Sequence, residues 1–314
     1  MNSTDTLVQI LSITAPVFSM VLMGMVLSHF KLVDDTFVRT ASNLIYRATM
    51  PTLFFLSIWQ ADLQQSLRPS LIFFMSLGTL LCFGLAWWWA SRKLPYGQRG
   101  AFIQGSFRGN CGVLSFALVA NYYGEYGQSV GGVLVGFTIL LFNVLSVFTL
   151  SYYSSTMEFS IKKMFKEFAA NPLIIGVLLG LVSSAIKLEI PLWIHTSAKY
   201  FSGMTLPLAL ICVGATLSIS GLKDSGAASA QATAIKVAIA PLVACLLAWM
   251  FGVEGRDLVI LWMFLASPTA AASFAMALAA GADGKLAANI IALSTLVAMG
   301  SMTFGIYALR IWGH

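Results

Sequence analysis

The chain alternates between long apolar runs and short polar stretches. A helix needs about 20 predominantly apolar residues to cross the hydrocarbon core of a bilayer. Ten runs approach this length, and no alternating pattern typical of a membrane β-barrel competes with them. We therefore predict an all-α integral membrane protein with ten transmembrane helices. Their expected limits are residues 7–30, 39–59, 70–91, 99–122, 130–153, 171–187, 192–219, 227–252, 257–280 and 286–311.

The composition supports this assignment and excludes a soluble protein. The 314 residues are 58% hydrophobic and 10% charged, with a mean hydropathy of +0.85. Soluble domains carry roughly 25% charged residues. The net charge of +6 does not gather on one soluble face, so nucleic acid is not an expected partner. The first ten residues contain Asp5 and no Lys or Arg, so we expect the first run to be a permanent span rather than a cleaved signal peptide.

The loop cations predict the orientation. Cytoplasmic loops of membrane proteins carry an excess of Lys and Arg. With ten spans, ten loop cations fall on one side and five on the other, which makes the richer side cytoplasmic and puts both termini on the non-cytoplasmic side. The ten are Lys31, Arg39, Arg92, Lys93, Arg99, Lys162, Lys163, Lys166, Lys223 and Lys285. The expected location is the cytoplasmic (inner) membrane, with the lipid bilayer as the surrounding partner.

A cytoplasmic connecting loop at 154–170 divides the chain into two halves, residues 1–153 and 171–314, which resemble each other. Identical Pro, Gly, Lys and Arg residues recur in the two halves, 156 positions apart and, further along the chain, 157 positions apart. The pairs are Pro16 and Pro172, Gly24 and Gly180, Lys31 and Lys187, Pro51 and Pro207, Arg99 and Arg256, Gly124 and Gly281, and Gly127 and Gly284. Five spans per half make the second half enter from the opposite side, so we predict two inverted five-helix repeats, a recurring plan of secondary transporters.

The fourth and ninth spans occupy equivalent places in the halves, and both contain helix-breaking residues. Residues 104–112 of span four hold three glycines and Asn110, and span nine holds Pro268. Glycine weakens a helix, and proline removes a backbone donor. Freed backbone groups are tolerated at membrane depth only where protein or a wet cavity satisfies them. Gly and Pro are also ordinary packing residues in membrane helices, but paired breaks at matching places favour a transport site.

Three cations and no carboxylates fall inside the expected spans. Arg108 lies at the break in span four, where half-helix N-termini and a guanidinium together suit an anion. Its alternative partners are backbone carbonyls freed by the break. Arg47 either faces the site or extends to the cytoplasmic edge, and Lys236 is expected to extend to a membrane edge. Because proton and sodium relays usually use embedded carboxylates, carboxylate-based cation coupling is not expected. Binding of sodium by carbonyls and hydroxyls stays open as an alternative.

The remaining polar features predict neither catalysis nor a metal site. Asn143 in span five either faces the site or bonds to a neighbouring helix. The four cysteines lie inside apolar runs without metal-ligand spacing, as small packing residues do. Motifs of zinc hydrolases, serine hydrolases and P-loop enzymes do not occur. We therefore expect no enzyme, no cofactor and no bound metal.

Several stretches resemble the auxin efflux carrier family, and the resemblance runs the length of the chain. Residues 41–55 resemble its second span, and residues 108–112 resemble its fourth-span crossover. Asn171 and Pro172 open the sixth span as in bacterial members, and residues 206–215 are similar to the seventh span. The short central loop also resembles the bacterial carriers. Family members often have a proline at the fourth-span break, where this chain has glycines.

The resemblance implies a fold shared with bile-acid symporters and sodium/proton antiporters. Spans 1, 2, 6 and 7 would form a scaffold, spans 3–5 and 8–10 would form a transport domain, and spans 4 and 9 would cross at the site. Homodimers through the scaffold helices are implied as well. The crossover asparagine carries over to Asn110 and the crossover proline to Pro268. Substrates of the family are organic anions, including malate or malonate in bacterial members.

The main hypothesis is therefore an elevator-type secondary transporter of a small organic anion. The residues expected to bind the substrate are Arg108, Gly109, Asn110, Cys111, Gly112, Ser267, Pro268, Thr269, Asn143 and Arg47. A second hypothesis is sodium-coupled symport of an amphipathic organic anion. A third is a membrane sensor or a subunit of a larger assembly that does not transport.

Overall fold

The structure is a computed structural model that describes residues 3–61, 66–154, 166, 169–217 and 226–313. Within these ranges the regular elements are helices, apart from one isolated β-bridge. Most of the expected connecting loop at 154–170, with Lys162 and Lys163, lies outside the described residues, as does Lys223. The helices are α1 (Ser3–His29), α2 (Asp35–Leu44), α3 (Met50–Trp59), α5 (Pro69–Lys93), α6 (Tyr96–Phe107), α7 (Phe116–Tyr153), α9 (Pro172–Ala185), α10 (Leu192–Gly203), α11 (Thr205–Ala215), α13 (Ala227–Ala234), α14 (Ala240–Met250), α15 (Gly255–Leu265), α16 (Ala272–Ala279) and α17 (Gly284–Ile311). Three π-helical turns, η1 (Ile45–Thr49), η2 (Cys111–Ser115) and η3 (Ile235–Ile239), continue directly into α3, α7 and α14.

Six helical segments among the described residues are long and apolar enough to cross a membrane. They are Val8–His29, Pro69–Lys93, Cys111–Tyr153, Leu192–Ala215, Ala227–Met250 and Gly284–Ile311, and α9 is a shorter apolar helix. Two of the other expected spans, 99–122 and 257–280, are interrupted because the chain leaves the helical conformation within them. The structure is therefore that of a multi-pass helical membrane protein. Along the chain, its helices occur in the same order as the ten expected runs.

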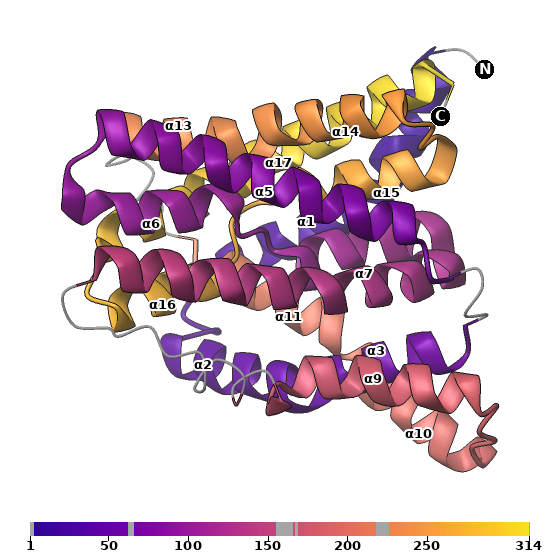
Figure 1. The fold of residues 1–314 in the computed structure, drawn as a ribbon. Helices are drawn as coiled ribbons and strands as arrows, with labels where there is room; N and C mark the ends of the chain where they lie inside the picture. Colours follow the sequence, from indigo (N-terminus) through magenta and orange to yellow (C-terminus); the bar gives the residue numbers. More distant parts are fainter. Residues whose placement is uncertain (1–2, 62–65, 155–165, 167–168, 218–225, 314) are drawn as a thin grey trace.

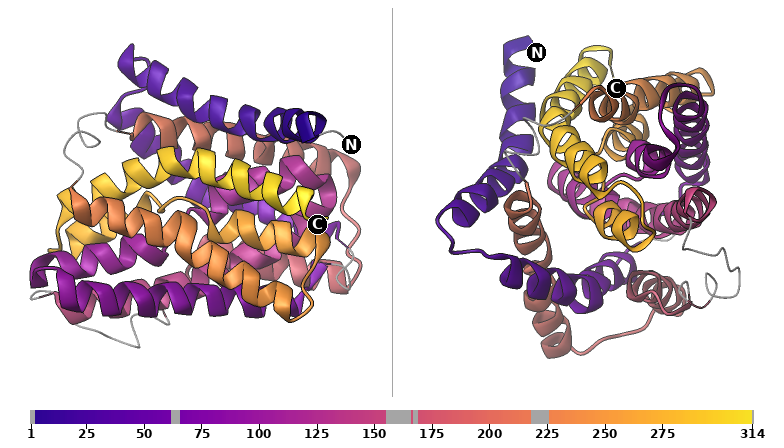
Figure 2. Two further views of the ribbon diagram at one scale, coloured as in Figure 1. Left: turned by 90° about the horizontal axis from the view of Figure 1, so that it is seen from above. Right: turned by 90° about the vertical axis from the view of Figure 1, so that its left-hand side faces the viewer.

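The helices form two groups that are seen end-on in the right panel of Figure 2. One group contains α1, α2, α3, α9, α10 and α11, in which α3 packs against α9 and α1 packs against α11. The other is a bundle of α5, α6, α7 and α13 to α17. In the view of Figure 1, the long helices of both groups run across the picture in roughly the same direction.

The ends of α1 and α9 have the same local structure. Lys31 and Lys187 have positive φ angles of 58° and 52°, in the left-handed region that ends many helices. The amide of Leu32 donates to the Leu27 carbonyl at 3.0 Å, and the amide of Leu188 donates to the Ser183 carbonyl at 2.9 Å. These bonds and residues are related by the offset of 156 found in the sequence.

The packing of the same helices repeats as well. A Cβ atom on Gly24 in α1 would collide with the carbonyl oxygen of Ile211 in α11. A Cβ atom on Gly180 in α9 would lie 3.0 Å from the carbonyl oxygen of Phe55 in α3. Both glycines and both carbonyl residues are again 156 positions apart, so the α1–α11 and α3–α9 contacts are equivalent.

Residues 111–153 form a helical hairpin that turns at Gly124. This glycine has a φ of 57° and a ψ of −133°, which no right-handed helix contains. After the turn, the helix lies back on the segment before it, because Gly131 faces the ring of Phe116 and Gly127 faces the backbone of Val119. The turn falls between the expected fourth and fifth spans.

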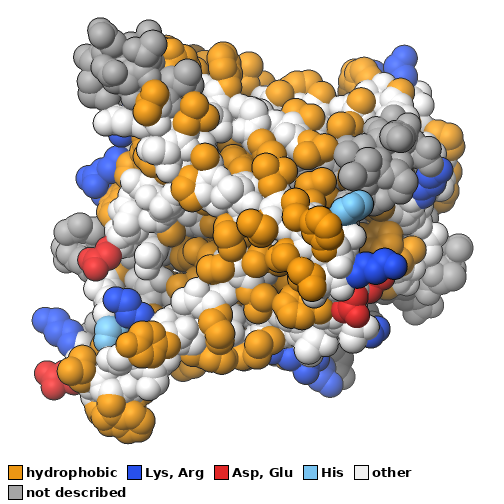
Figure 3. Space-filling model, turned by 180° about the vertical axis from the view of Figure 1, so that it is seen from behind, with side chains coloured by type: hydrophobic (Ala, Val, Ile, Leu, Met, Phe, Trp, Pro, Cys, Tyr) orange, Lys and Arg blue, Asp and Glu red, His pale blue; other side chains and the backbone are white. Residues whose placement is uncertain are grey.

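The outer surface matches a lipid environment. In Figure 3, hydrophobic side chains cover the middle of the face in view, and most of the charged side chains lie toward its two ends. Exposed large hydrophobic residues occur on α1, α5, α9, α10 and α14, among other elements. Such a surface is unfavourable in water and suits the interior of a bilayer.

Candidate functional site

Two interrupted helices meet at the centre of the bundle. Helix α6 ends at Phe107 and helicity resumes at Cys111, while α15 ends at Leu265 and α16 begins at Ala272. The two extended linkers pair as a short antiparallel bridge between Gly109 and Thr269. The prediction that these two helices are broken is therefore confirmed.

The bridge satisfies backbone groups that the breaks release. The amide of Asn110 donates to the Pro268 carbonyl at 2.7 Å, and the amide of Ala270 donates to the Arg108 carbonyl at 2.9 Å. Unpaired backbone groups at membrane depth are costly, so each linker serves as the hydrogen-bond partner of the other. Gly109 is required for the close approach, because a Cβ atom there would collide with the Ser267 hydroxyl.

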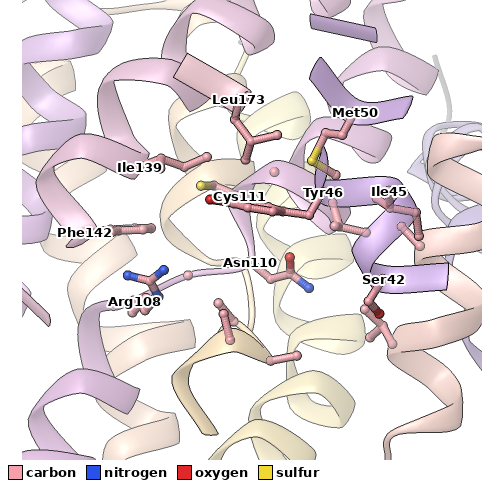
Figure 4. A pocket seen from close by; sticks show the side chains of 18 of the residues that line it. Ser42, Ile45, Tyr46, Met50, Arg108, Asn110, Cys111, Ile139, Phe142 and Leu173 are labelled. Carbon is pink, nitrogen blue, oxygen red and sulfur yellow. The ribbon is translucent and has the colours of Figure 1, made fainter. Parts of the chain in front are cut away.

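A cavity of about 290 Å³ opens beside this crossover. Figure 4 shows Arg108 and Asn110 on one side of it, with Tyr46, Met50 and Ser42 on the other. Its lining combines the crossover with residues of α2, η1, α9 and α11, so it lies between the two groups of helices. The lining residues are Ser42, Ile45, Tyr46, Met50, Arg108, Gly109, Asn110, Cys111, Gly112, Val113, Ile139, Phe142, Asn143, Asn171, Leu173, Ala209, Cys212, Val213, Thr216, Ala270, Ala271 and Ala272.

Both new helix starts face this cavity. The lining of the cavity includes Cys111 and Gly112 at the start of η2, and Ala271 and Ala272 at the start of α16. The first amides of a helix have no acceptor within the helix and carry a partial positive charge. Within the described residues, no side chain caps either start. The two helix starts are therefore available to a negatively charged group.

Arg108 supplies a full positive charge at the same place. Its Nη1 donates to Asn143 Oδ1 at 2.9 Å and to Ser146 Oγ at 3.1 Å, both on α7. Arg108 Nε is buried and has no hydrogen-bond partner in the described structure. The guanidinium is thus held by side chains of α7 rather than by carbonyls freed at the break, and its donors are only partly used.

Arg47 lies next to this site rather than in it. It is exposed and lines a second cavity of about 750 Å³ together with Tyr46, Arg108 and Asn143. Among the described residues, neither cavity has an Asp or a Glu in its lining. The two neighbouring cavities therefore carry only positive formal charge.

Three of the expected site residues do not reach either cavity. Ser267 and Thr269 are buried, and the Thr269 hydroxyl donates to the Gly105 carbonyl at 2.6 Å. The Ser267 hydroxyl donates to the Phe264 carbonyl at 2.8 Å, and Pro268 contributes its carbonyl to Asn110. These residues build the crossover, while Ala270 and Ala271 of the linker and Ala272 at the start of α16 face the cavity.

The expectation that Lys236 extends to a membrane edge is wrong. Lys236 lies in η3, its side chain is 3% exposed, and its Nζ donates to the Leu265 carbonyl at 2.6 Å. An ammonium group is stabilised at a helix C-terminus, where carbonyls lack partners and the dipole is negative. The C-terminal end of α15 therefore stabilises the positive charge of Lys236, which water at a membrane edge would otherwise have stabilised.

Sequence reasoning also missed the polar residues that line the cavity from the group containing α2, α9 and α11. Ser42 and Tyr46 line the cavity from α2 and η1, Asn171 from the start of α9, and Thr216 from the end of α11. The Asn171 side chain accepts from the Leu173 amide at 3.0 Å and so caps α9. Its signal in the sequence was the Asn-Pro pair, which indicated a helix start but not a position at the cavity.

Asn143 is predicted to orient Arg108 toward the cavity. Replacing it with alanine removes the shorter of the two bonds to the guanidinium, and a bond to a charged group contributes about 1.5–3 kcal/mol. For any anion bound here, Asn143→Ala is expected to raise KM by about tenfold or more, measured as transport in proteoliposomes. Thr149→Val on the same helix is the matched control, because the Thr149 hydroxyl donates only within α7, to the Leu145 carbonyl. An unchanged KM in Asn143→Ala would contradict this role.

A membrane-embedded helical bundle with a central crossover of two broken helices, and a cavity at that crossover, defines a membrane transporter. The comparisons agree. The family model described as "Membrane transport protein" matches residues 10–159 and 154–306, so the chain belongs to this auxin efflux carrier-like family. The chain is 25% identical over 305 residues to an uncharacterized transporter of Methanothermobacter thermautotrophicus, covering 96% of this chain and 97% of the relative. It is also 25% identical over 312 residues to an uncharacterized transporter of Methanocaldococcus jannaschii, covering 95% and 96% of the two chains.

Proposed function

We propose that the protein is an elevator-type secondary transporter that moves a small organic anion, a mono- or dicarboxylate such as malate or malonate, across the cytoplasmic membrane. One observation carries the proposal. Two helix starts and the Arg108 guanidinium converge on a single cavity whose described lining contains no carboxylate. Backbone amides at helix starts and a guanidinium together are well suited to bind a carboxylate.

The size of the cavity supports a small substrate. Ligand sites in proteins commonly measure about 300–1,000 Å³, and this cavity of about 290 Å³ lies at the lower limit. Arg108 also borders the second cavity, which is larger and carries Arg47. We assign the smaller cavity to the bound anion and the larger one to the path by which the anion arrives.

The ten-span inverted repeat is part of this proposal. The equivalent helix ends at Lys31 and Lys187 support it, as do the equivalent packing contacts of Gly24 and Gly180. The hairpin at Gly124 divides residues 111–153 into the end of a fourth span and a complete fifth span. In this arrangement residues 1–153 form one repeat and residues 171–314 the other.

The position of the cavity supports an elevator mechanism. Helices α1, α2–α3, α9 and α10–α11 would be the scaffold, and α5 to α7 with α13 to α17 would be the moving transport domain. The cavity has one wall from each group. A substrate held at such a boundary is exposed to the other side when one group slides against the other, without passing through a continuous pore.

The orientation and the assembly are proposed with the same scheme. Both termini face the non-cytoplasmic side, which follows from the excess of cations in the opposite loops. Two copies associate through scaffold helices, which leaves each transport domain free to move. The support for this dimer is the resemblance to the auxin efflux carrier family.

The first test is uptake into proteoliposomes that contain the purified protein. We expect saturable uptake of radiolabelled malate, malonate or a related acid. Asn110→Ala is expected to lower uptake at limiting substrate by about threefold to tenfold, because the Asn110 side chain borders the cavity and a neutral hydrogen bond contributes about 0.5–1.5 kcal/mol.

Asn43→Ala is the matched control, because Asn43 is exposed on α2 and is absent from both cavity linings. Flux that rises linearly with concentration and never saturates would indicate a pore. The absence of uptake for all mono- and dicarboxylates tested would refute the assigned substrate class.

The apolar part of the cavity favours one alternative substrate. Ile45, Ile139, Leu173 and Val213 line it opposite or beside the charged crossover. An amphipathic organic anion, with a carboxylate at the crossover and an apolar body against these residues, would also fit. In the sodium-coupled form of this alternative, uptake requires sodium ions, so replacing sodium with choline decides between the two.

A further inference from the structure

The buried ammonium of Lys236 has no role in the cavity, although it lies at the crossover. Lys236 is absent from the linings of both cavities. A Cβ atom added to Gly109 would lie 3.1 Å from Lys236 Nζ, so the ammonium lies directly beside the linker that carries Arg108 and Asn110. A charge at this depth is costly unless the surroundings compensate it, so its presence requires an explanation.

The ammonium lies where the end of a half-helix favours positive charge. Its bond to the Leu265 carbonyl places it at the C-terminal end of the half-helix α15. In broken-helix transporters, half-helix C-terminal ends and unwound carbonyls are the groups that bind coupling cations. The titratable side chains that interact with Lys236 are the thiols of Cys82 and Cys111, and within the described residues no salt bridge involves it.

The ammonium and a free cation would compete for the same place. A sodium ion near the end of α15 would need the carbonyl that Lys236 already occupies, and it would be repelled by the ammonium. Two cations in contact inside a protein repel each other strongly, because little water separates and screens them. The buried lysine and a bound sodium ion are therefore mutually exclusive at this end of α15.

We propose that Lys236 is a tethered cation that takes the position of a coupling ion, holds the two linkers in their binding shape, and makes anion transport independent of sodium. The uptake test of this inference rests on the proposed transport of an anion. The test by sodium binding does not depend on that proposed function. Lys236 acts as a positioning residue, because it neutralises the end of α15 and contacts the linker rather than the substrate. Removing the ammonium should leave a vacancy beside the Leu265 carbonyl that a small cation can fill.

The uptake experiment compares sodium with choline at equal ionic strength. Wild-type uptake is expected to change by less than about twofold between the two salts. Lys236→Ala is expected to lose at least about tenfold in choline and to recover part of this loss in sodium, whereas Lys236→Arg retains the charge and most of the activity. Lys93→Ala, at an exposed position in the last turn of α5, is the matched control and should behave as wild type.

A second measurement does not depend on the substrate. Thermal unfolding of the detergent-solubilised protein is followed at increasing sodium chloride, with choline chloride as the reference. Sodium is expected to raise the Tm of Lys236→Ala by at least about 2 °C and to leave the wild type and Lys93→Ala unchanged, because a ligand stabilises the state that binds it.

The outcomes separate the two proposals. Wild-type uptake that requires sodium, or a wild-type Tm that rises with sodium but not with choline, would overturn the tethered cation. Lys236→Ala that transports like the wild type in choline would overturn it as well. If no carboxylate is transported but sodium stabilises only Lys236→Ala, the tethered cation stands and the proposed substrate class fails. Should Lys236→Ala not fold, Lys236→Met, which keeps the length of the side chain and removes its charge, undergoes the same two measurements.

Discussion

Replacing Arg108 with alanine is expected to reduce the apparent affinity for a small carboxylate by about 100-fold. The guanidinium is held at the cavity by two hydrogen bonds that it donates to side chains of α7, and it keeps a donor without a partner in the described structure. Truncating one member of a desolvated charge pair commonly costs about 2–5 kcal/mol, and 100-fold corresponds to about 2.7 kcal/mol. The measurement is the concentration dependence of uptake into proteoliposomes.

Two controls make this result specific. Arg39→Ala removes an exposed arginine from α2 and should leave the affinity unchanged. Arg108→Lys keeps the charge but loses the forked geometry, so it should fall between the wild type and Arg108→Ala. If Arg108→Ala and Asn110→Ala both transport with wild-type kinetics, the anion does not bind at this crossover.

Replacing Gly214 with alanine is expected to cause the largest loss of stability among single methyl additions in the group formed by α1, α2, α3, α9, α10 and α11. Gly214 lies in α11, and a Cβ atom there would collide with the carbonyl oxygen of Val21 in α1. Backbone of a neighbouring helix cannot move aside as a flexible side chain can, and overpacking typically costs about 1–3 kcal/mol. We expect the Tm in detergent to fall by several degrees.

Gly84→Ala in α5 is the matched control. A Cβ atom on Gly84 meets nothing within 4 Å, and alanine is the better helix former by about 1 kcal/mol. Its Tm should be equal to or above that of the wild type. A Gly214→Ala protein that unfolds at the wild-type temperature would show that α1 and α11 are not closely packed through these residues.

The breaks could be predicted because their causes are local. Glycines at 105, 109 and 112 weaken helix whatever surrounds them, and Pro268 removes an amide donor from its own chain segment. The equal spacing of residue pairs such as Lys31 and Lys187 is also visible in the sequence, because it does not depend on contacts between distant residues. The pairing of the two linkers could not be predicted, because the glycine at position 109 permits a close approach but does not indicate which distant segment approaches it.

The amino-acid sequence by itself determined that the chain is a helical membrane protein, where two of its helices break, and that its embedded charges are cationic. These properties depend on the transfer energy and conformational preference of residues within one segment. Only the tertiary structure decided what compensates each charge: Asn143 and Ser146 hold Arg108 at the cavity, and the end of α15 holds Lys236 behind it. The physical reason is that a buried charge is stabilised by dipoles brought together from several helices, and their positions exist only once the helices have packed.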